Sequence, residues 1–339
     1  MKKNIAVLVG LFFVVGFLAG MSHAAEKVVT LEFSSFFPPT DKLSMALRDF
    51  GKDMETKTNG RVKVNFHPGG VLVPPHQTFD GILKEVVDIG ESSFAITPGR
   101  FPVMEALDLP TGAKSSVVMT KLANEFYKKF KPKELDAVKM LFITAPSQQY
   151  FHTKKPIRKL EDLKGMKIRC AGGAVTELVK ALGAVPVVIP ASDVYDALSK
   201  GVMEGTVVPW AAVGQFKFYE VVDYTTINHR TSVSSVGFIA MNKAKWNSLP
   251  PDVQKIIDAL SEEYAAKMAV IWDAKDEESI KAAAAYKHQT INLSDEEEER
   301  WVQRAAPIYD AYIKDKSAKG FPAGEELSWI KDWIKQNQK

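Results

Sequence analysis

Residues 166–189 of the chain read MKIRCAGGAVTELVKALGAVPVVI. Met166 to Arg169 has the pattern of a short strand, Gly172-Gly173 opens a helical stretch, and a second apolar strand runs from Val185 to Ile189. This order of strand, helix and strand predicts a parallel or mixed sheet with helices on its faces, which is the α/β class. Ligands of such sheets bind at the carboxyl ends of the strands. Arg169 stands at such an end and is therefore a candidate binding residue.

The same alternation continues toward the N-terminus. Strand patterns at 28–33 and 62–66 flank a helical stretch that Thr40 or Asp41 can cap. The loops at 34–37 and 91–94 each follow a strand pattern, so the same rule makes them candidate site loops.

Toward the C-terminus, Ser192 can cap a further helix, and residues 205–210 predict a strand followed by a loop that carries Trp210. After Pro250-Pro251 a long helical pattern runs to about residue 287. Ser294 and Glu297 form a capping box for one more helix. The acidic run that follows Ser294 is expected to be a solvated helix start favoured by the helix dipole.

The first 25 residues have the features of a secretory signal peptide. Lys2 and Lys3 precede an apolar run, and small residues around Ala24 and Ala25 offer a cleavage site. The remaining length of about 314 residues suggests two domains. Without the two lysines the formal net charge falls from +3 to +1, which gives no argument for nucleic acid binding. The single Cys170 cannot form an internal disulfide and is expected to be a small buried apolar residue.

Motifs of common enzyme classes are missing from the sequence. It has no glycine-rich nucleotide-binding loop, no G-x-S-x-G elbow, no H-E-x-x-H and no calcium loop. No histidine pairs with another His or Cys at metal-ligand spacing. These features favour a protein that is not an enzyme and that needs neither metal nor cofactor.

Several segments resemble, in order, the solute receptors of tripartite ATP-independent periplasmic (TRAP) transporters, the DctP-like family. The central one is LEDLKGMKIR at 160–169, followed by LVKALGAVPV at 178–187 and by SDVYDAL at 192–198. Other similar segments lie upstream at 98–102 and 107–110, and downstream at 218–222 and 241–243. The resemblance extends from about Val28 to about Ile257.

The resemblance implies a two-lobed periplasmic-binding-protein fold of type II. Each lobe would be a mixed sheet flanked by helices, with strands crossing near Pro146–Gln149 and Ser234–Val236 and a long helix spanning both lobes. We expect lobe 1 to contain residues 26–148 and 235–274, and lobe 2 to contain residues 149–234 and 275–339. The ligand would be buried by closure of the two lobes, and the closed form would dock on the small and large TRAP membrane subunits. It further implies a periplasmic protein that acts as a monomer.

In the resembled family, the Arg of the K-I-R motif holds the substrate carboxylate, and here that residue is Arg169. A second Arg, which some members carry about twenty residues earlier, is missing, because Ser147-Gln148-Gln149-Tyr150 stands there. An Asn that often precedes the later Pro is replaced by Val208. These departures favour an aromatic or aliphatic monocarboxylate. The remaining expected ligand-binding residues are Trp210, Phe37, Phe94, Ser93, Gln149, Tyr150, Val208, Phe238 and Arg230.

Three alternatives remain open from the sequence. Arg230 is a second cation candidate that could restore a site for C4-dicarboxylates. A secreted enzyme on the same scaffold would need a base near Arg169, for which His152 and His229 are the candidates. A third possibility is a sensor partner, whose closed form would dock on a membrane receptor in place of a transporter.

Overall fold

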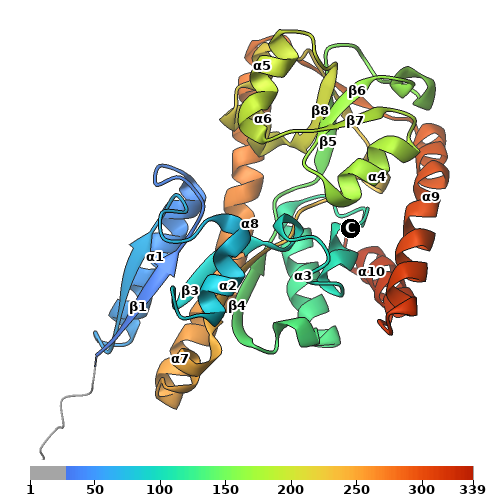
Figure 1. Cartoon of the computed structure of the whole chain (residues 1–339). Helices are drawn as coiled ribbons and strands as arrows, with labels where there is room; N and C mark the ends of the chain where they lie inside the picture. Colours follow the sequence, from blue (N-terminus) through green and yellow to red (C-terminus); the bar gives the residue numbers. More distant parts are fainter. Residues whose placement is uncertain (1–27, 339) are drawn as a thin grey trace, which may run out of the picture.

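Segments rich in Val, Ile and Phe build two separate sheets, each covered by helices (Figure 1). The computed structural model describes residues 28–338, so the predicted signal peptide at 1–25 lies outside the described residues. We call the part built on the first sheet lobe 1 and the part built on the second sheet lobe 2.

The sheet of lobe 1 has the strand order β2-β1-β3-β10-β4. β1 pairs in parallel with β2 and β3, whereas β10 runs antiparallel to β3 and β4, so the sheet is mixed. Its strands are β1 (Val29–Ser34), β2 (Val62–His67), β3 (Ile89–Ser93), β4 (Val138–Thr144) and β10 (Gly237–Asn242). The helices of this lobe are α1 (Lys42–Lys57), α2 (Thr78–Leu83), α3 (Ser116–Phe130) and α7 (Lys243–Asn247).

The sheet of lobe 2 has the order β11-β9-β5-β8-β6-β7 and is also mixed, because β5 runs antiparallel to β8 and β9 while β6 is parallel to β7 and β8. Its strands are β5 (Gln149–Thr153), β6 (Lys167–Cys170), β7 (Val185–Val188), β8 (Gly205–Pro209), β9 (Tyr224–Ile227) and β11 (Gln289–Asn292). The helices of this lobe are α4 (Gly173–Ala181), α5 (Val194–Ser199) and α6 (Trp210–Gln215).

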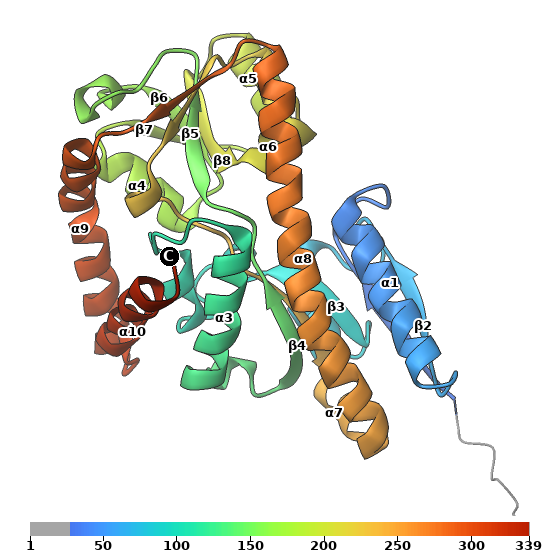
Figure 2. The same cartoon turned by 180° about the vertical axis from the view of Figure 1, so that it is seen from behind.

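The chain crosses between the sheets twice as extended backbone and then along a helix. It leaves the first sheet after β4 and returns between β9 and β10. The helix is α8 (Pro251–Ala285), which starts with Pro at its first position and packs against α1 and α3 of lobe 1 and α6 of lobe 2. Figure 2 shows it in orange, running past both sheets. The long spanning helix expected from the sequence is therefore present.

The C-terminal segment departs from the predicted assignment of 275–339 to lobe 2. Trp301 of α9 (Asp295–Ala318) packs in a core of lobe 2, whereas Tyr312 of the same helix belongs to a core of lobe 1. Helix α10 (Ala323–Asn337) packs on α3 through Ile330 and Trp333. Thus α9 is a second spanning helix, on the opposite side of the molecule from α8, and α10 belongs to lobe 1 (Figures 1 and 2).

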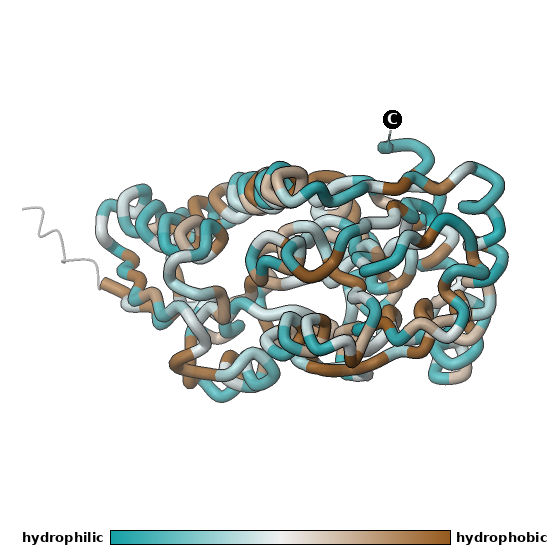
Figure 3. Tube along the Cα trace, turned by 90° about the horizontal axis from the view of Figure 1, so that it is seen from above, coloured by the Kyte–Doolittle hydropathy of each residue, from teal (hydrophilic) through white to brown (hydrophobic). Residues whose placement is uncertain are grey.

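Two local expectations also need correction. Ser192 does not cap α5, because its hydroxyl donates to Asp193 and a short 3-10 turn precedes the helix. Trp210, expected in a loop, is instead the first residue of α6. Along the helices the hydropathy-coloured trace of Figure 3 alternates between hydrophilic and apolar residues, as expected for helices that cover a sheet with one side only.

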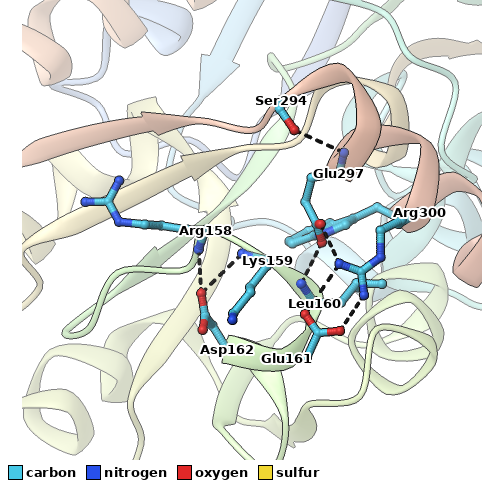
Figure 4. A network of polar contacts seen from close by, with 9 residues as sticks. Arg158, Lys159, Leu160, Glu161, Asp162, Ser294, Glu297 and Arg300 are labelled. Carbon is cyan, nitrogen blue, oxygen red and sulfur yellow. Dashed lines mark hydrogen bonds and ion pairs between the residues drawn. The ribbon is translucent and has the colours of Figure 1, made fainter.

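The start of α9 is bound to the turn that carries the LEDL motif (Figure 4). The Ser294 hydroxyl accepts from the Glu297 amide at 3.3 Å, which is one half of the predicted capping box. The Glu297 carboxylate does not return to Ser294 but accepts from the Leu160 amide at 2.6 Å and pairs with Arg300. Glu297 is buried, as is Glu298, so this part of the acidic run is not the solvated face that was predicted.

Candidate ligand site between the lobes

Arg169 lies near the carboxyl end of β6, a strand between β8 and β7 in the lobe 2 sheet. Its neighbours Ile168 and Cys170 face a core formed with α4 and α9, so alternation places Arg169 on the other face. The strand register sets it beside Val187 of β7, which packs with the cluster of α5 and α6. The side chain is buried, and its Nε donates to the Ile189 carbonyl at 3.0 Å.

The charge of Arg169 is not balanced by the protein. Among the described residues no acidic side chain forms an ion pair with the guanidinium, and burial lowers its pKa. A buried charge without a partner is costly unless an opposite charge or strong acceptors meet it. The flat guanidinium matches a carboxylate with two parallel hydrogen bonds. The position therefore suits a ligand carboxylate.

Thr206 of β8 was not recognised in the sequence. It is the register partner of Arg169, it is fully buried, and its hydroxyl has no hydrogen-bond partner among the described residues. A threonine at the start of a strand carries no signal of this kind by itself, because the signal comes from the pairing with β6.

Trp210 closes the carboxyl end of β8, since α6 follows this strand without a loop. Its ring is buried and packs edge-on against His152 and His288, at centroid distances of 5.0 and 5.5 Å. The amide of the next residue, Ala211, donates to Asp276 Oδ1 of α8 at 2.7 Å. Trp210 is thus fixed by contacts from the sheet and from the spanning helix.

Gln149 and Tyr150 open β5 at the same edge, because β5 runs antiparallel to β8. Gln149 is buried, and its Nε2 donates to Ser235 Oγ at 3.1 Å. The Tyr150 hydroxyl lies 3.1 Å from His229 Nδ1, and its register partner Val208 is buried. The structure therefore brings Gln149, Tyr150 and Val208 together with Arg169 and Trp210 at one sheet edge.

The two histidines considered as bases are both engaged. His152 is fully buried, burial lowers its pKa to about 3, and its ring nitrogens contact Thr225 Oγ1 and the Val208 carbonyl. His229 contacts Tyr150, and burial lowers its pKa. Their hydrogen bonds link β5 to its neighbours, which is a structural role.

Lobe 1 contributes the loop after β1. Phe37 packs edge-on against Trp272 of α8 with a centroid distance of 6.0 Å. Glu91 of β3 holds this loop, because its Oε2 accepts from Ser35 Oγ at 2.9 Å and from the Phe36 amide at 3.2 Å. Burial raises the pKa of Glu91 to about 8. The loop predicted at 34–37 is therefore tied to β3, whereas the prediction of a loop at 91–94 is wrong, because residues 91–93 extend β3 and Phe94 begins a 3-10 turn.

A cavity of about 1260 Å³ opens between the lobes next to these elements. Of the ten expected ligand-binding residues, Ser93 lines it and the other nine do not; Arg169 lies beside it, because Ala171, two residues further along the chain, is part of the wall. Further lining comes from the crossover serines Ser234 and Ser235 and from α9. The Ser93 hydroxyl donates to the Val236 carbonyl at 3.1 Å, which fixes it at the cavity wall.

Three predicted site residues lie elsewhere. Phe94 and Phe238 pack on each other, with centroids 5.0 Å apart, and both contact Phe101 in the lobe 1 core. Their faces are taken up by protein, so they are core residues. Arg230 is half exposed and pairs with Glu299 at 2.7 Å, so it is a surface arginine and supplies no second cation to the site.

Among the described residues no helix is long and apolar enough to cross a membrane. Within the same part of the chain, His, Cys, Asp and Glu form no group that could hold a metal ion.

Known proteins share both the sequence pattern and the two-lobed architecture of this chain. The family model of bacterial extracellular solute-binding proteins, family 7 (DctP), matches residues 33–315. The crystal structure of a TRAP periplasmic solute binding protein from Desulfovibrio salexigens is 30% identical, with a TM-score of 0.86 over 92% of this chain and 97% of that one.

Two further relatives have named ligands. A TRAP solute binding protein from Rhodoferax ferrireducens, solved with copurified benzoate, is 28% identical with a TM-score of 0.81, covering 91% of this chain and 98% of that one. The C4-dicarboxylate-binding periplasmic protein DctP of Rhodobacter capsulatus is 26% identical over 85% of this chain and 87% of that protein. The two-lobed fold, the match over residues 33–315 and the 30% identity to a TRAP receptor show that the chain belongs to the DctP family, family 7 of the bacterial extracellular solute-binding proteins.

Proposed function

We propose that this protein is the receptor of a TRAP transporter that captures a small organic monocarboxylate, aromatic or aliphatic, between its two lobes. The observation that carries the proposal is the buried guanidinium of Arg169, which has no acidic partner among the described residues. Arg169 would hold the ligand carboxylate, with Thr206 as a second donor. Trp210, Tyr150 and Phe37 would supply aromatic walls for the apolar part of the ligand.

The preference for one carboxylate over two is supported by the surrounding charges. The place of a second arginine is taken by Gln149, whose amide already donates to Ser235. Arg230 is paired with Glu299 on the surface. The Rhodoferax relative carries benzoate, in line with this chemistry, while the Rhodobacter relative is named for C4-dicarboxylates and defines the alternative.

Capture would work by closure of the lobes. A ligand drives closure when it binds the closed form more tightly than the open one. Arg169 and Trp210 lie on lobe 2, and Phe37 and Ser93 on lobe 1, so a bound acid touches both lobes only when they approach. The closed monomer would then dock on the small and large membrane subunits in the periplasm, after cleavage of the signal peptide near Ala24 or Ala25.

The test is native mass spectrometry of the freshly purified protein, followed by calorimetry with the acid it releases or with benzoate. We expect an unmodified organic acid, and Arg169→Ala should weaken its binding by roughly 3–5 kcal/mol because the carboxylate would be left buried and unpaired. Arg230→Ala is the matched control and should bind normally, since its guanidinium pairs on the surface. Equal affinity in Arg169→Ala would refute the site, and recovery of a converted acid would favour an enzyme.

A further inference from the structure

The interlobe cavity has an unbalanced acid on the side of lobe 1. Four acidic residues and three lysines line the cavity. Each lysine pairs with a lining acid: Lys180 with Glu177 at 2.9 Å, Lys319 with Asp315 at 2.7 Å, and Lys316 with Glu105. The acid that remains is Asp108, which has no ion-pair partner among the described residues.

The hydrogen bonds of Asp108 are also incomplete. Its Oδ1 accepts from the Val236 amide at 3.5 Å, the outer limit of such a bond, and Oδ2 has no partner within residues 28–338. The carboxyl group is partly buried, and burial raises its pKa to about 7. A carboxylate in such a place needs donors that the lobe does not provide.

The serines beside Asp108 do not supply those donors. The hydroxyl protons of Ser93 and Ser234 are given to the carbonyls of Val236 and Pro146, at 3.1 and 3.0 Å. Ser235 Oγ accepts from Gln149, and its own proton is given to no described residue, Asp108 included. The Asp108 carboxyl group therefore has no side-chain donor among the described residues and can accept from a ligand group that donates.

We propose that Asp108 binds a hydrogen-bond donor, a hydroxyl or an ammonium group, on the part of the ligand that lies away from the carboxylate held by Arg169. The ligand class is then a hydroxy- or amino-substituted carboxylate. This inference rests on the proposed function, because it assumes that Arg169 takes the carboxylate end.

The same arrangement disfavours a dicarboxylate. Its second carboxylate would meet Asp108 in place of a cation, and because burial already raises the pKa of Asp108 to about 7, one of the two acids would have to take up a proton before they could lie together. Asp108 therefore selects both for a donor and against a second negative charge, which is specificity obtained by attraction and repulsion together.

Calorimetric titrations with benzoate, 3- and 4-hydroxybenzoate, 3-(aminomethyl)benzoate and succinate test the proposal. We expect the wild type to bind at least one donor-bearing acid about tenfold more tightly than benzoate, the size of one charge-assisted hydrogen bond. In Asp108→Ala this ratio should fall to about one, with benzoate itself little changed. Asp108→Asn distinguishes the two donors, because an amide oxygen still accepts from a hydroxyl but loses the attraction for an ammonium group.

Glu177→Gln is the matched control, since it removes one negative charge from the cavity wall at a residue that already pairs with Lys180. In this variant the ratio of the affinity for the donor-bearing acid to the affinity for benzoate should equal that of the wild type. An unchanged ratio in Asp108→Ala, or succinate binding to the wild type more tightly than every donor-bearing acid, would overturn the inference while leaving carboxylate capture in place. Failure of all these acids to bind the wild type would instead refute the proposed function, and the inference with it.

Discussion

Glu91 shows what a single buried carboxyl group does at this site. It lies in the middle of β3 and reaches the loop after β1, where it accepts from Ser35 and Phe36 through one oxygen. Within residues 28–338 no basic side chain pairs with it, and burial raises its pKa to about 8. The protonated form is therefore favoured, and the loop that carries Phe37 rests on an uncharged acid at neutral pH.

This burial predicts a pH dependence of stability with a definite sign. The folded chain keeps the Glu91 proton up to about pH 8, whereas the unfolded chain releases it near the ordinary value of 4.5. The stability that the bound proton gives the folded chain is thus complete below about pH 4.5 and is lost as the pH rises toward 8, by roughly 4 kcal/mol. Denaturant unfolding from pH 5 to 8 should show this loss in the wild type and a smaller one in Glu91→Gln, which is neutral throughout.

Glu262→Gln controls for a general effect of charge, because Glu262 is an exposed acid of α8 that pairs with Lys128. Its pH profile should follow that of the wild type. Parallel profiles for the wild type and Glu91→Gln would contradict the assignment of a buried proton to Glu91.

The position of a single residue could be predicted from the sequence where a motif marks the end of a strand. It could not be predicted where the residue pairs with another that is distant in the chain. The place of Arg169 near the end of a strand could be predicted from the apolar pattern around K-I-R, and its role as a carboxylate ligand stays a prediction. The ion pair of Arg230 could not, because Glu299 lies 69 residues further along the chain. Phe94 and Phe238 were misplaced for another reason. Phe238 lies in β10 and Phe94 directly follows β3, and almost every residue of these two strands is buried, so alternation does not indicate which face meets the cleft.

At the level of elements, one turn of α8 holds both lobes. Asp273 accepts from the amides of Ser116 and Val117 at the start of α3 in lobe 1. Asp276, three residues later, accepts from Ala211 at the start of α6 in lobe 2. A carboxylate at a helix N-terminus accepts hydrogen bonds from amides that have no partner within the helix, and its negative charge interacts favourably with the helix dipole. The two side chains therefore fix the position of each lobe relative to the spanning helix.

Asp276→Asn should affect ligand binding through Trp210, because the amide next to this tryptophan loses its charged acceptor. We expect a stability loss of about 0.5–2 kcal/mol, as for other N-terminal helix contacts, together with a several-fold weaker affinity. Asp273→Asn is the matched control, with a similar stability loss but little change in affinity, since α3 carries no predicted ligand contact. Thermal unfolding and calorimetry measure both quantities, and equal affinities in the two variants would disprove a positioning role for Asp276.

The elements themselves were largely predictable, but their packing was not. The helix after Pro250-Pro251 was expected to end near residue 287 and ends at Ala285. Proline at its start and a continuous helical pattern are local signals, which explains this agreement. The return of α10 to α3 depends on contacts between Trp333 and residues some two hundred positions earlier, and no local pattern encodes such a pairing.

At the scale of the whole molecule, continuous helices connect the apolar cores of lobe 1 with those of lobe 2. Leu260 and Tyr264 of α8 lie in a lobe 1 core, and Ala283 of the same helix lies in a lobe 2 core. Likewise, α9 places Trp301 in lobe 2 and Tyr312 in lobe 1. Most of the stability of a helix in a protein comes from its packing, so unfolding of one lobe removes part of the packing that orders these helices against the other lobe.

We therefore predict that the two lobes unfold in one cooperative transition, although their sheets are separate. Trp301→Ala in lobe 2 and Phe142→Ala in lobe 1 each remove a buried ring and should lower the free energy of unfolding by about 3–5 kcal/mol. In both variants the amides of β4 and β10 should lose protection from hydrogen exchange together with those of β6 and β8. If the amides of lobe 1 stayed protected while those of lobe 2 exchanged in Trp301→Ala, the spanning helices would not couple the lobes, and each lobe would be an independent folding unit.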